Sequence, residues 1–200
     1  MDHLIYLVKA AKEAGVPETF IHFFGDGRDT APKSAHGYLT TILSKLDELN
    51  YGKIATITGR YYAMDRDKRW DRVEKAFNAL VKGEGEKSGN LLQTILDRYA
   101  ADQTDEFLTP IIATGVDGSI KDGDTVITFN FRSDRMREIS QALGISPPPF
   151  ETTAVPKDIE IISMTQYKAD FPFKNIFPPQ VITLFLALIL SHIDNGQCIG

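Results

Sequence analysis

The strongest constraint on the fold is an alternation of helical and β-type patterns along the chain. Apolar residues recur at helical spacing in residues 4–11, 39–49, 70–81, 91–99 and a stretch through Ile139 and Leu143, and β-rich runs cover residues 20–24, 54–58, 125–131 and 159–164. Strands that alternate with such helices form mainly parallel sheets, so the pattern predicts an α/β three-layer sandwich with helices on both faces of one sheet. Turn signals between residues 107 and 128 predict a small antiparallel excursion.

The composition is that of a soluble globular chain with an acidic balance. Its 200 residues are 42% hydrophobic and carry a net charge of -5, which argues against a general nucleic-acid or membrane-surface binder with its basic excess. The start of the chain predicts a helix and no signal peptide. The apolar stretch at residues 181–190 is shorter than the roughly 20 residues that span a bilayer. The single Cys198 fits a reducing compartment, so we expect a cytoplasmic protein.

Arginines directly follow three of the predicted strands. The first strand leads into Arg28, the second into Arg60, and the third into Arg132 and Arg135. Ligands bind beyond the carboxyl ends of parallel strands, so four guanidinium groups would meet at one edge if these strands are neighbours. Arginine donates paired, charge-assisted hydrogen bonds to phosphate and carboxylate, which predicts a small, multiply anionic ligand. The alternative is that each arginine is an ordinary loop residue paired with a nearby carboxylate.

The turn at Asp26-Gly27-Arg28-Asp29 and the loop at residues 59–70 hold further candidates. Asp26 reads as a turn residue, whereas Asp29 could cap the turn or accept a substrate hydroxyl or its proton. Aspartates interleave with the basic and aromatic residues of the loop, so it resembles an internally paired network more than a nucleic-acid track. Arg66 can be functional or structural. The four histidines and the cysteine lack metal-ligand spacing, and no metal site is predicted.

Three motifs resemble the cofactor-independent phosphoglycerate mutases in sequence and in order. They are Phe24-Gly25-Asp26-Gly27-Arg28-Asp29, the stretch from Gly59-Arg60-Tyr61-Tyr62 to Trp70, and Asn130-Phe131-Arg132-Ser133-Asp134-Arg135. The resemblance runs to about Gln180 and divides the chain into a phosphoglycerate-binding domain at residues 1–180 and a divergent tail at residues 181–200.

This resemblance implies interconversion of 3-phosphoglycerate and 2-phosphoglycerate, with no requirement for 2,3-bisphosphoglycerate. In the family, a phosphatase-like domain holds two manganese ions and a serine nucleophile, while the domain that this chain resembles binds the glycerate. Asp29 would contact the substrate hydroxyls and is the candidate general base. The implied substrate-binding residues are Arg28, Asp29, Arg60, Arg66, Arg132 and Arg135.

The sequence also departs from the family pattern. A substrate-contacting histidine of the family falls just before the start of this chain, and His3 is not its equivalent. The phosphatase-like domain and its metal ligands are missing, so we expect the chain to be inactive alone, and the full-length protein to be monomeric. A truncated or mis-spliced product, or a tail read out of frame, is the expected origin. The alternatives are a stand-alone sensor of phosphorylated metabolites and an interaction module whose tail docks elsewhere.

Overall fold

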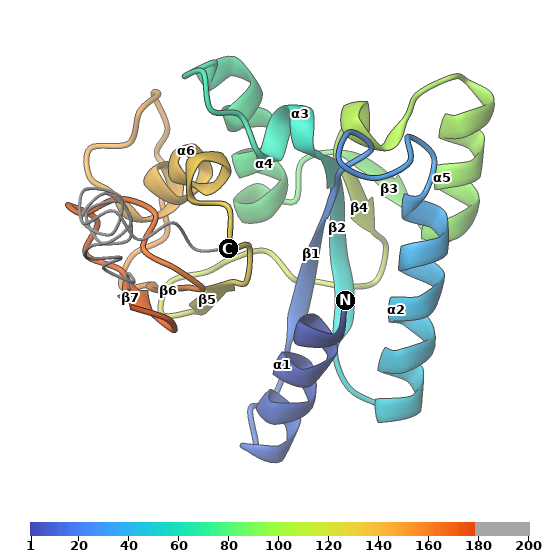
Figure 1. Cartoon of the computed structure of the whole chain (residues 1–200), viewed down its shortest axis with the longest axis horizontal. Coiled ribbons are helices and arrows are strands. Elements are labelled where there is room, and N and C mark those ends of the chain that lie inside the picture. The colour runs from blue at the N-terminus through green and yellow to red at the C-terminus, as the bar shows by residue number, and fades with distance from the viewer. Residues whose placement is uncertain (179–200) are drawn as a thin grey trace, which may run out of the picture.

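A computed structural model describes residues 1–178, in which the strands divide between two small sheets (Figure 1). The first sheet has the order β1-β2-β4-β3. Its central pair, β1 and β2, runs parallel from the pairing of Phe20 with Lys53 to that of Gly25 with Gly59. Strand β3 is parallel to β4, whereas β2 and β4 are antiparallel. The strands of this sheet are β1 (Phe20–Gly25), β2 (Lys53–Gly59), β3 (Glu86–Ser88) and β4 (Ile111–Ala113).

Helices cover both faces of the first sheet (Figure 1). On one face, α1 (Asp2–Glu13), α2 (Ala35–Leu49) and α5 (Leu91–Ala100) pack apolar side chains against the inner strands. Ile57 of β2 and Leu39 of α2 are completely buried there. On the other face, a second core joins α4 (Trp70–Lys82) to α6 (Ser133–Gly144), with Phe77 at its centre. Two short helical turns, α3 (Arg60–Ala63) and η1 (Asp105–Phe107), complete this part.

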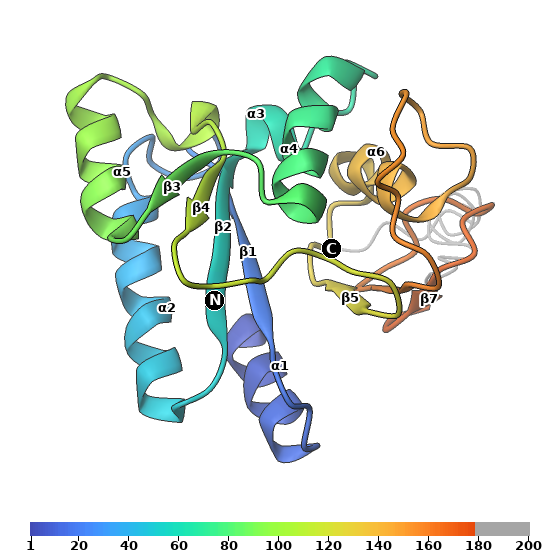
Figure 2. The ribbon, with the colours of Figure 1, turned by 180° about the vertical axis from the view of Figure 1, so that it is seen from behind.

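The second sheet lies beside α6, as the view from behind shows (Figure 2). It consists of β5 (Thr125–Thr128), β6 (Glu160–Ser163) and β7 (Lys174–Asn175), all parallel and in that order. Its core side is continuous with the core of α4 and α6, because Ile161 and Tyr167 belong to the same cluster as Phe77. The second sheet therefore extends the hydrophobic core that covers one face of the first.

The predicted α/β class, with mainly parallel pairing and helices on both faces, is confirmed, but the strands form two sheets where one was predicted. The strands of the two sheets differ in burial. Six consecutive residues of β2 are buried, as in a strand covered on both faces, whereas β5 alternates between exposed and half-buried positions, as in a strand covered on one face. The antiparallel excursion corresponds to β4, and β2·β4 is the one antiparallel pairing within residues 1–178.

The third predicted strand, at residues 125–131, is shorter than expected. Strand β5 ends at Thr128, and the buried Tyr167 hydroxyl lies 2.7 Å from the carbonyl oxygen of Asn130. The same hydroxyl also lies 3.2 Å from the carbonyl oxygen of Thr128, so Tyr167 contacts the backbone where the strand ends. No helix within residues 1–178 is long and apolar enough to cross a membrane. The predicted tail at residues 181–200 lies outside the described residues.

Candidate functional site

The ends of β1 and β2 place the first two arginine-bearing segments side by side. Gly25 and Gly59 form the last pair of the parallel ladder, so the loop after β1 and the start of α3 leave the sheet together. The Arg60 side chain is only 3% exposed, and its Nη1 lies 2.5 Å from Asp26 Oδ1 and 2.9 Å from Asp29 Oδ2. A buried guanidinium needs such partners, because an unpaired charge in the interior is strongly unfavourable.

Asp26 shapes the loop as well as pairing with Arg60. Its Oδ1 accepts hydrogen bonds from the backbone N–H groups of Arg28 and Asp29, at 3.2 and 3.1 Å. Partial burial acts to raise its pKa, but these amide bonds and the Arg60 guanidinium hold the pKa of Asp26 below its usual value. Gly27 adopts the left-handed conformation, with φ of +66°, which a residue with a side chain rarely takes. The turn role predicted for Asp26 is thus present, together with an ion pair.

Asp29 joins the two sheets through its carboxylate. Its Oδ2 accepts hydrogen bonds from both Arg60 and Arg132, and Arg132 is the residue that precedes α6. The hydrogen bond from Arg60 and the positive charge of Arg132 lower the pKa of Asp29. An arginine that follows β5 therefore meets an aspartate that follows β1, although the two strands belong to different sheets.

Arg66 and Arg135 lie where the loop after α3 meets α6. Arg66 Nη1 is 2.9 Å from Asp134 Oδ2, and Arg135 Nη1 is 3.2 Å from the carbonyl oxygen of Met64. Burial and the positive charges of Arg60, Arg66 and Arg28 lower the pKa of Arg135.

Arg28 is the least constrained of the predicted residues. Its side chain is 60% exposed, and its Nη1 lies 3.8 Å from Glu106 Oε1. The structure thus brings the five predicted arginines to the loop after β1, to α3 and the loop that follows it, and to the start of α6, a region that we call the arginine rim. Four of them pair there with the carboxylates of Asp26, Asp29, Glu106 and Asp134. Such an arrangement can hold a small anion if the exposed arginines exchange their carboxylate partners for it.

The segment η1 supports this rim, and sequence reasoning missed it. Asp105 is completely buried, and its Oδ2 accepts hydrogen bonds from the N–H groups of Ser34 and Ala35, both at 2.8 Å. The Tyr99 hydroxyl donates to the other oxygen. A Cβ atom on Gly59 would fall 2.7 Å from the Asp105 carbonyl oxygen, so η1 packs directly on the end of β2. Nothing in the local pattern distinguished Asp105 from an ordinary loop aspartate.

Metal-ligating side chains do not gather in the part of the chain that the structure describes. Within residues 1–178 there is no group of three or more histidines, cysteines, aspartates or glutamates that could hold a metal ion. His22 lies in β1 with its Nδ1 2.9 Å from Thr56 Oγ1, and burial lowers the pKa of this histidine to about 4. The two manganese ions that the resemblance implies therefore do not fit the described residues.

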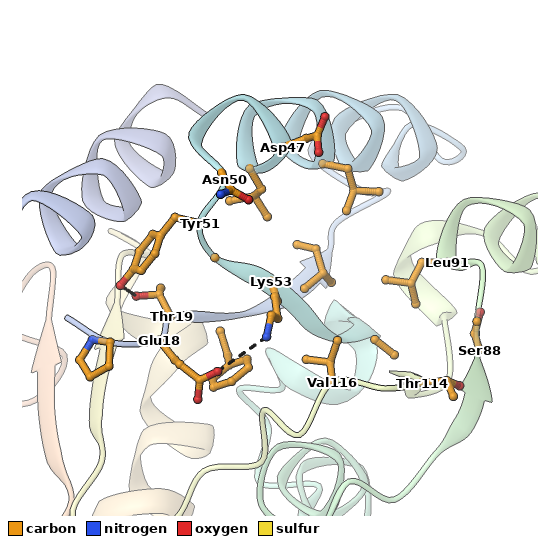
Figure 3. Close-up of a pocket in the computed structure, with 18 residues that line it drawn as sticks. Glu18, Thr19, Asp47, Asn50, Tyr51, Lys53, Ser88, Leu91, Thr114 and Val116 are labelled. Carbon is orange, nitrogen blue, oxygen red and sulfur yellow. Dashed lines mark hydrogen bonds and ion pairs between the residues drawn. The ribbon is translucent and has the colours of Figure 1, made fainter. Parts of the chain in front are cut away.

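A pocket of about 540 Å³ lies at the opposite end of the first sheet (Figure 3). It is lined by the start of β2, the end of α2 and the residues before β1. Two of the polar contacts between its lining residues are visible in Figure 3. They are an ion pair of 3.6 Å between Lys53 and Glu18 and a hydrogen bond of 2.7 Å between Thr19 and Tyr51. None of the predicted site residues lines this pocket.

Comparison with known proteins identifies the family of this chain. The family model described as "BPG-independent PGAM N-terminus" matches residues 1–169. The 2,3-bisphosphoglycerate-independent phosphoglycerate mutase of Caenorhabditis elegans is 50% identical over 184 residues, which are 90% of this chain and 34% of that protein. The enzyme of the same name from Onchocerca volvulus is 50% identical over 195 residues, which are 96% of this chain and 38% of that protein.

A solved structure shows the same likeness. A Leishmania mexicana phosphoglycerate mutase, determined at low cobalt concentration, superimposes with a TM-score of 0.83 at 25% identity, covering 91% of this chain and 36% of the other. The chain therefore spans little more than a third of the length of these relatives. Since the family model covers both arginine loops and the start of α6, the chain belongs to the cofactor-independent phosphoglycerate mutases, of which it matches the N-terminal region.

Proposed function

We propose that the chain is the phosphoglycerate-binding part of an isomerase that interconverts 3-phosphoglycerate and 2-phosphoglycerate in glycolysis. The observation that carries the proposal is the bridging of Asp29 between Arg60 and Arg132, with Arg66, Arg135 and Arg28 on the same rim. A phosphoglycerate carries a phosphate and a carboxylate on three carbons, and both groups match the paired donors of arginine.

The arginines would divide the work according to their burial. Arg60 is buried and doubly paired, so it would remain in place and define the floor of the site. Arg132 and Arg66 each have half of their side chain exposed and one carboxylate partner, so they can turn toward an incoming anion. Arg28 and Arg135 would complete the positive rim.

Asp29 is proposed to contact the substrate hydroxyls and to act as the general base for the return of the phosphoryl group. While Asp29 is paired with Arg60 and Arg132, the two guanidinium groups lower its pKa and make it a poor base. An anion that draws Arg132 away would remove one of these partners and raise the proton affinity of Asp29. The same binding event would therefore prepare the base and hold the hydroxyl close to it, which makes the transfer effectively intramolecular.

The rest of the chemistry is proposed to come from a phosphatase-like domain that holds the serine nucleophile and two manganese ions. Those metals would stabilise the charge on the transferring group when they are bound. We further propose that the complete protein is cytoplasmic and monomeric, requires no 2,3-bisphosphoglycerate, and has no nucleic-acid or membrane partner. This chain alone would bind phosphoglycerate and turn none over.

Titration calorimetry of the 200-residue chain with 3-phosphoglycerate tests the binding proposal. Replacing Arg132 or Arg66 by glutamine should weaken binding at least tenfold, because each change removes a charge-assisted hydrogen bond of about 1.5–3 kcal/mol. Arg98→Gln, on α5 and paired with Glu86, is the matched control and should leave the affinity unchanged. Equal affinity in the Arg132, Arg66 and Arg98 variants would contradict the assigned site.

An activity assay with added manganese separates the alternatives. The chain should show no mutase activity, and measurable turnover would refute the assignment of the chemistry to the other domain. Micromolar affinity without turnover would favour a stand-alone sensor of phosphorylated metabolites, since an isolated half of the site should bind weakly.

A further inference from the structure

Two buried carboxyl groups, Asp65 and Glu138, lie directly behind the arginine rim. Asp65 follows α3 and Glu138 belongs to α6, and the two residues are 5% and 6% exposed. Their carboxyl groups lie close together, because they accept the N–H groups of the consecutive residues Asp67 and Lys68. Carboxyl groups are rarely this buried unless they are paired, and two ionised carboxylates in contact repel each other. The substrate-binding role proposed above uses neither residue.

The two carboxyl groups accept hydrogen bonds from backbone N–H groups of the loop that carries Arg66. Asp65 Oδ2 accepts hydrogen bonds from the N–H groups of Asp67 and Arg69, at 3.0 and 2.9 Å. Glu138 Oε1 accepts the N–H of Lys68 at 2.8 Å. Three consecutive amides therefore end on two carboxyl groups. Lys68 has φ of +57°, an uncommon conformation for a residue with a side chain, so the loop needs contacts of this kind to keep its shape.

The same loop is tied to α6 at two further points. Arg66 pairs with Asp134, one helical turn before Glu138, and Arg135 donates to the Met64 carbonyl oxygen. The hydrogen bond from Lys68 to Glu138 is thus the third connection between loop and helix. If it opens, Arg66 loses the backbone restraint that keeps it against α6.

An unpartnered oxygen points to a proton between the two carboxyl groups. Glu138 Oε2 is buried and has no hydrogen-bond partner among residues 1–178. A proton on Oε2 would be donated to Asp65 and would satisfy this atom. Burial and the negative charges of Asp65 and Asp67 raise the pKa of Glu138 to about 7. On the α4 side the facing charge is Arg72, 3.8 Å from Asp65 Oδ1 and stacked on the Tyr61 ring.

We propose that Asp65 and Glu138 share one proton and act as a positioning pair that holds the loop amides, and through them Arg66, in the anion-binding arrangement. The contribution of Arg66 rests on the function proposed above. Loss of the shared proton leaves two adjacent carboxylates, whose repulsion loosens the Lys68 contact. Anion affinity should therefore fall as the pH rises through neutrality.

Nuclear magnetic resonance of the 200-residue chain tests the pair without any ligand. In protein labelled with ¹³C-glutamate, the Glu138 carboxyl should titrate with a midpoint near 7, and Glu138→Gln assigns its signal. A midpoint near the ordinary value of 4.5 would overturn the proposal. The exchange protection of the Lys68 amide should fall about tenfold between pH 6 and pH 8 in the parent chain and stay constant in Glu138→Gln, whose amide can both accept from Lys68 and donate to Asp65.

Calorimetry with 3-phosphoglycerate at pH 6 and pH 8 tests the consequence for binding. The ligand phosphate also titrates near pH 6, so at each pH the affinity of the parent chain is divided by the affinity of Glu138→Gln. This quotient should fall about tenfold from pH 6 to pH 8, and an unchanged quotient would overturn the positioning role. Glu138→Ala should bind more weakly at both pH values. If Glu138→Ala does not fold, the comparison of the parent chain with Glu138→Gln alone tests the positioning role.

Failure of the two proposals can be told apart. Absence of 3-phosphoglycerate binding in every variant, together with a Glu138 midpoint near 7 and a pH-dependent Lys68 amide, would refute the substrate assignment and support the pair. Binding that is present but equally pH-dependent in the parent chain and in Glu138→Gln would refute the pair and leave the substrate assignment standing.

Discussion

Replacing Asp105 should destabilise the protein more than any exposed substitution, because this carboxylate caps a helix from a distance. The Ser34 side chain makes no capping hydrogen bond to α2, and the first amides of that helix bind Asp105 Oδ2, from a residue 70 positions away. The negative charge also lies at the positive end of the helix dipole, where it is stabilising. Asp105 therefore holds together α2, the Tyr99 hydroxyl of α5 and the turn below the arginine rim.

The magnitude follows from the donors that lose their acceptor. Asp105→Leu leaves the buried Ala35 N–H, which Asp105 caps, and the Tyr99 hydroxyl unsatisfied, at about 1–3 kcal/mol each. We expect the free energy of unfolding to fall by about 2–6 kcal/mol. Asp105→Asn keeps one oxygen for the helix amides but no charge, and should lose only about 1–2 kcal/mol.

Urea unfolding at pH 7, followed by circular dichroism, measures these differences. Asp47→Leu is the matched control, since Asp47 is exposed on the same helix, and its effect should stay within about 0.5 kcal/mol. A loss below about 1 kcal/mol for Asp105→Leu, or equal losses for the leucine and asparagine variants, would refute the distant-cap explanation.

Three further predictions concern stability. Gly59→Ala should cost at least about 2 kcal/mol in urea unfolding, because its Cβ would meet the backbone of η1. Gly37→Ala, at an exposed position in the first turn of α2 with open space around it, should gain up to about 1 kcal/mol, and equal effects would contradict the close packing at Gly59. Tyr167→Phe should lose about 1 kcal/mol in the same assay, since the hydroxyl contacts Thr128 and Asn130, and a neutral result would argue against that anchor. The pKa of folded Glu138 is raised from 4.5 to about 7, so the stabilisation it provides is complete below about pH 4.5 and is lost as the pH rises to about 7. Relative to Glu138→Gln, the free energy of unfolding should fall by up to about 3 kcal/mol over this range. Parallel pH profiles of the two proteins would contradict this prediction.

The elements were predictable because their signals are local. Helical spacing of apolar residues located α4 and its end at Gly83, and the β-rich runs located β1 and β2, since both patterns depend on neighbours within a few positions. The short strands β3 and β7 were missed because two or three residues are too few to establish a period, and β4 was predicted only as an antiparallel excursion between residues 107 and 128. Arg28, Arg60, Arg132 and Arg135 were found for a related reason, because they follow predicted strands and ligands bind at the carboxyl ends of parallel strands. Arg66 was identified from the family resemblance.

Which side chains meet depends on contacts between distant parts of the chain. Arg60 finds Asp26 and Arg132 finds Asp29 at separations of 34 and 103 residues, and no local pattern encodes either distance. The division into two sheets and the burial of Asp105, Asp65 and Glu138 likewise depend on long-range packing. Local sequence patterns were enough to predict the longer helices and strands and the arginines that follow them, and three motifs were enough to indicate the family. Folding alone decided the carboxylate partners, because a buried charge is stable only beside groups that the completed core brings to it.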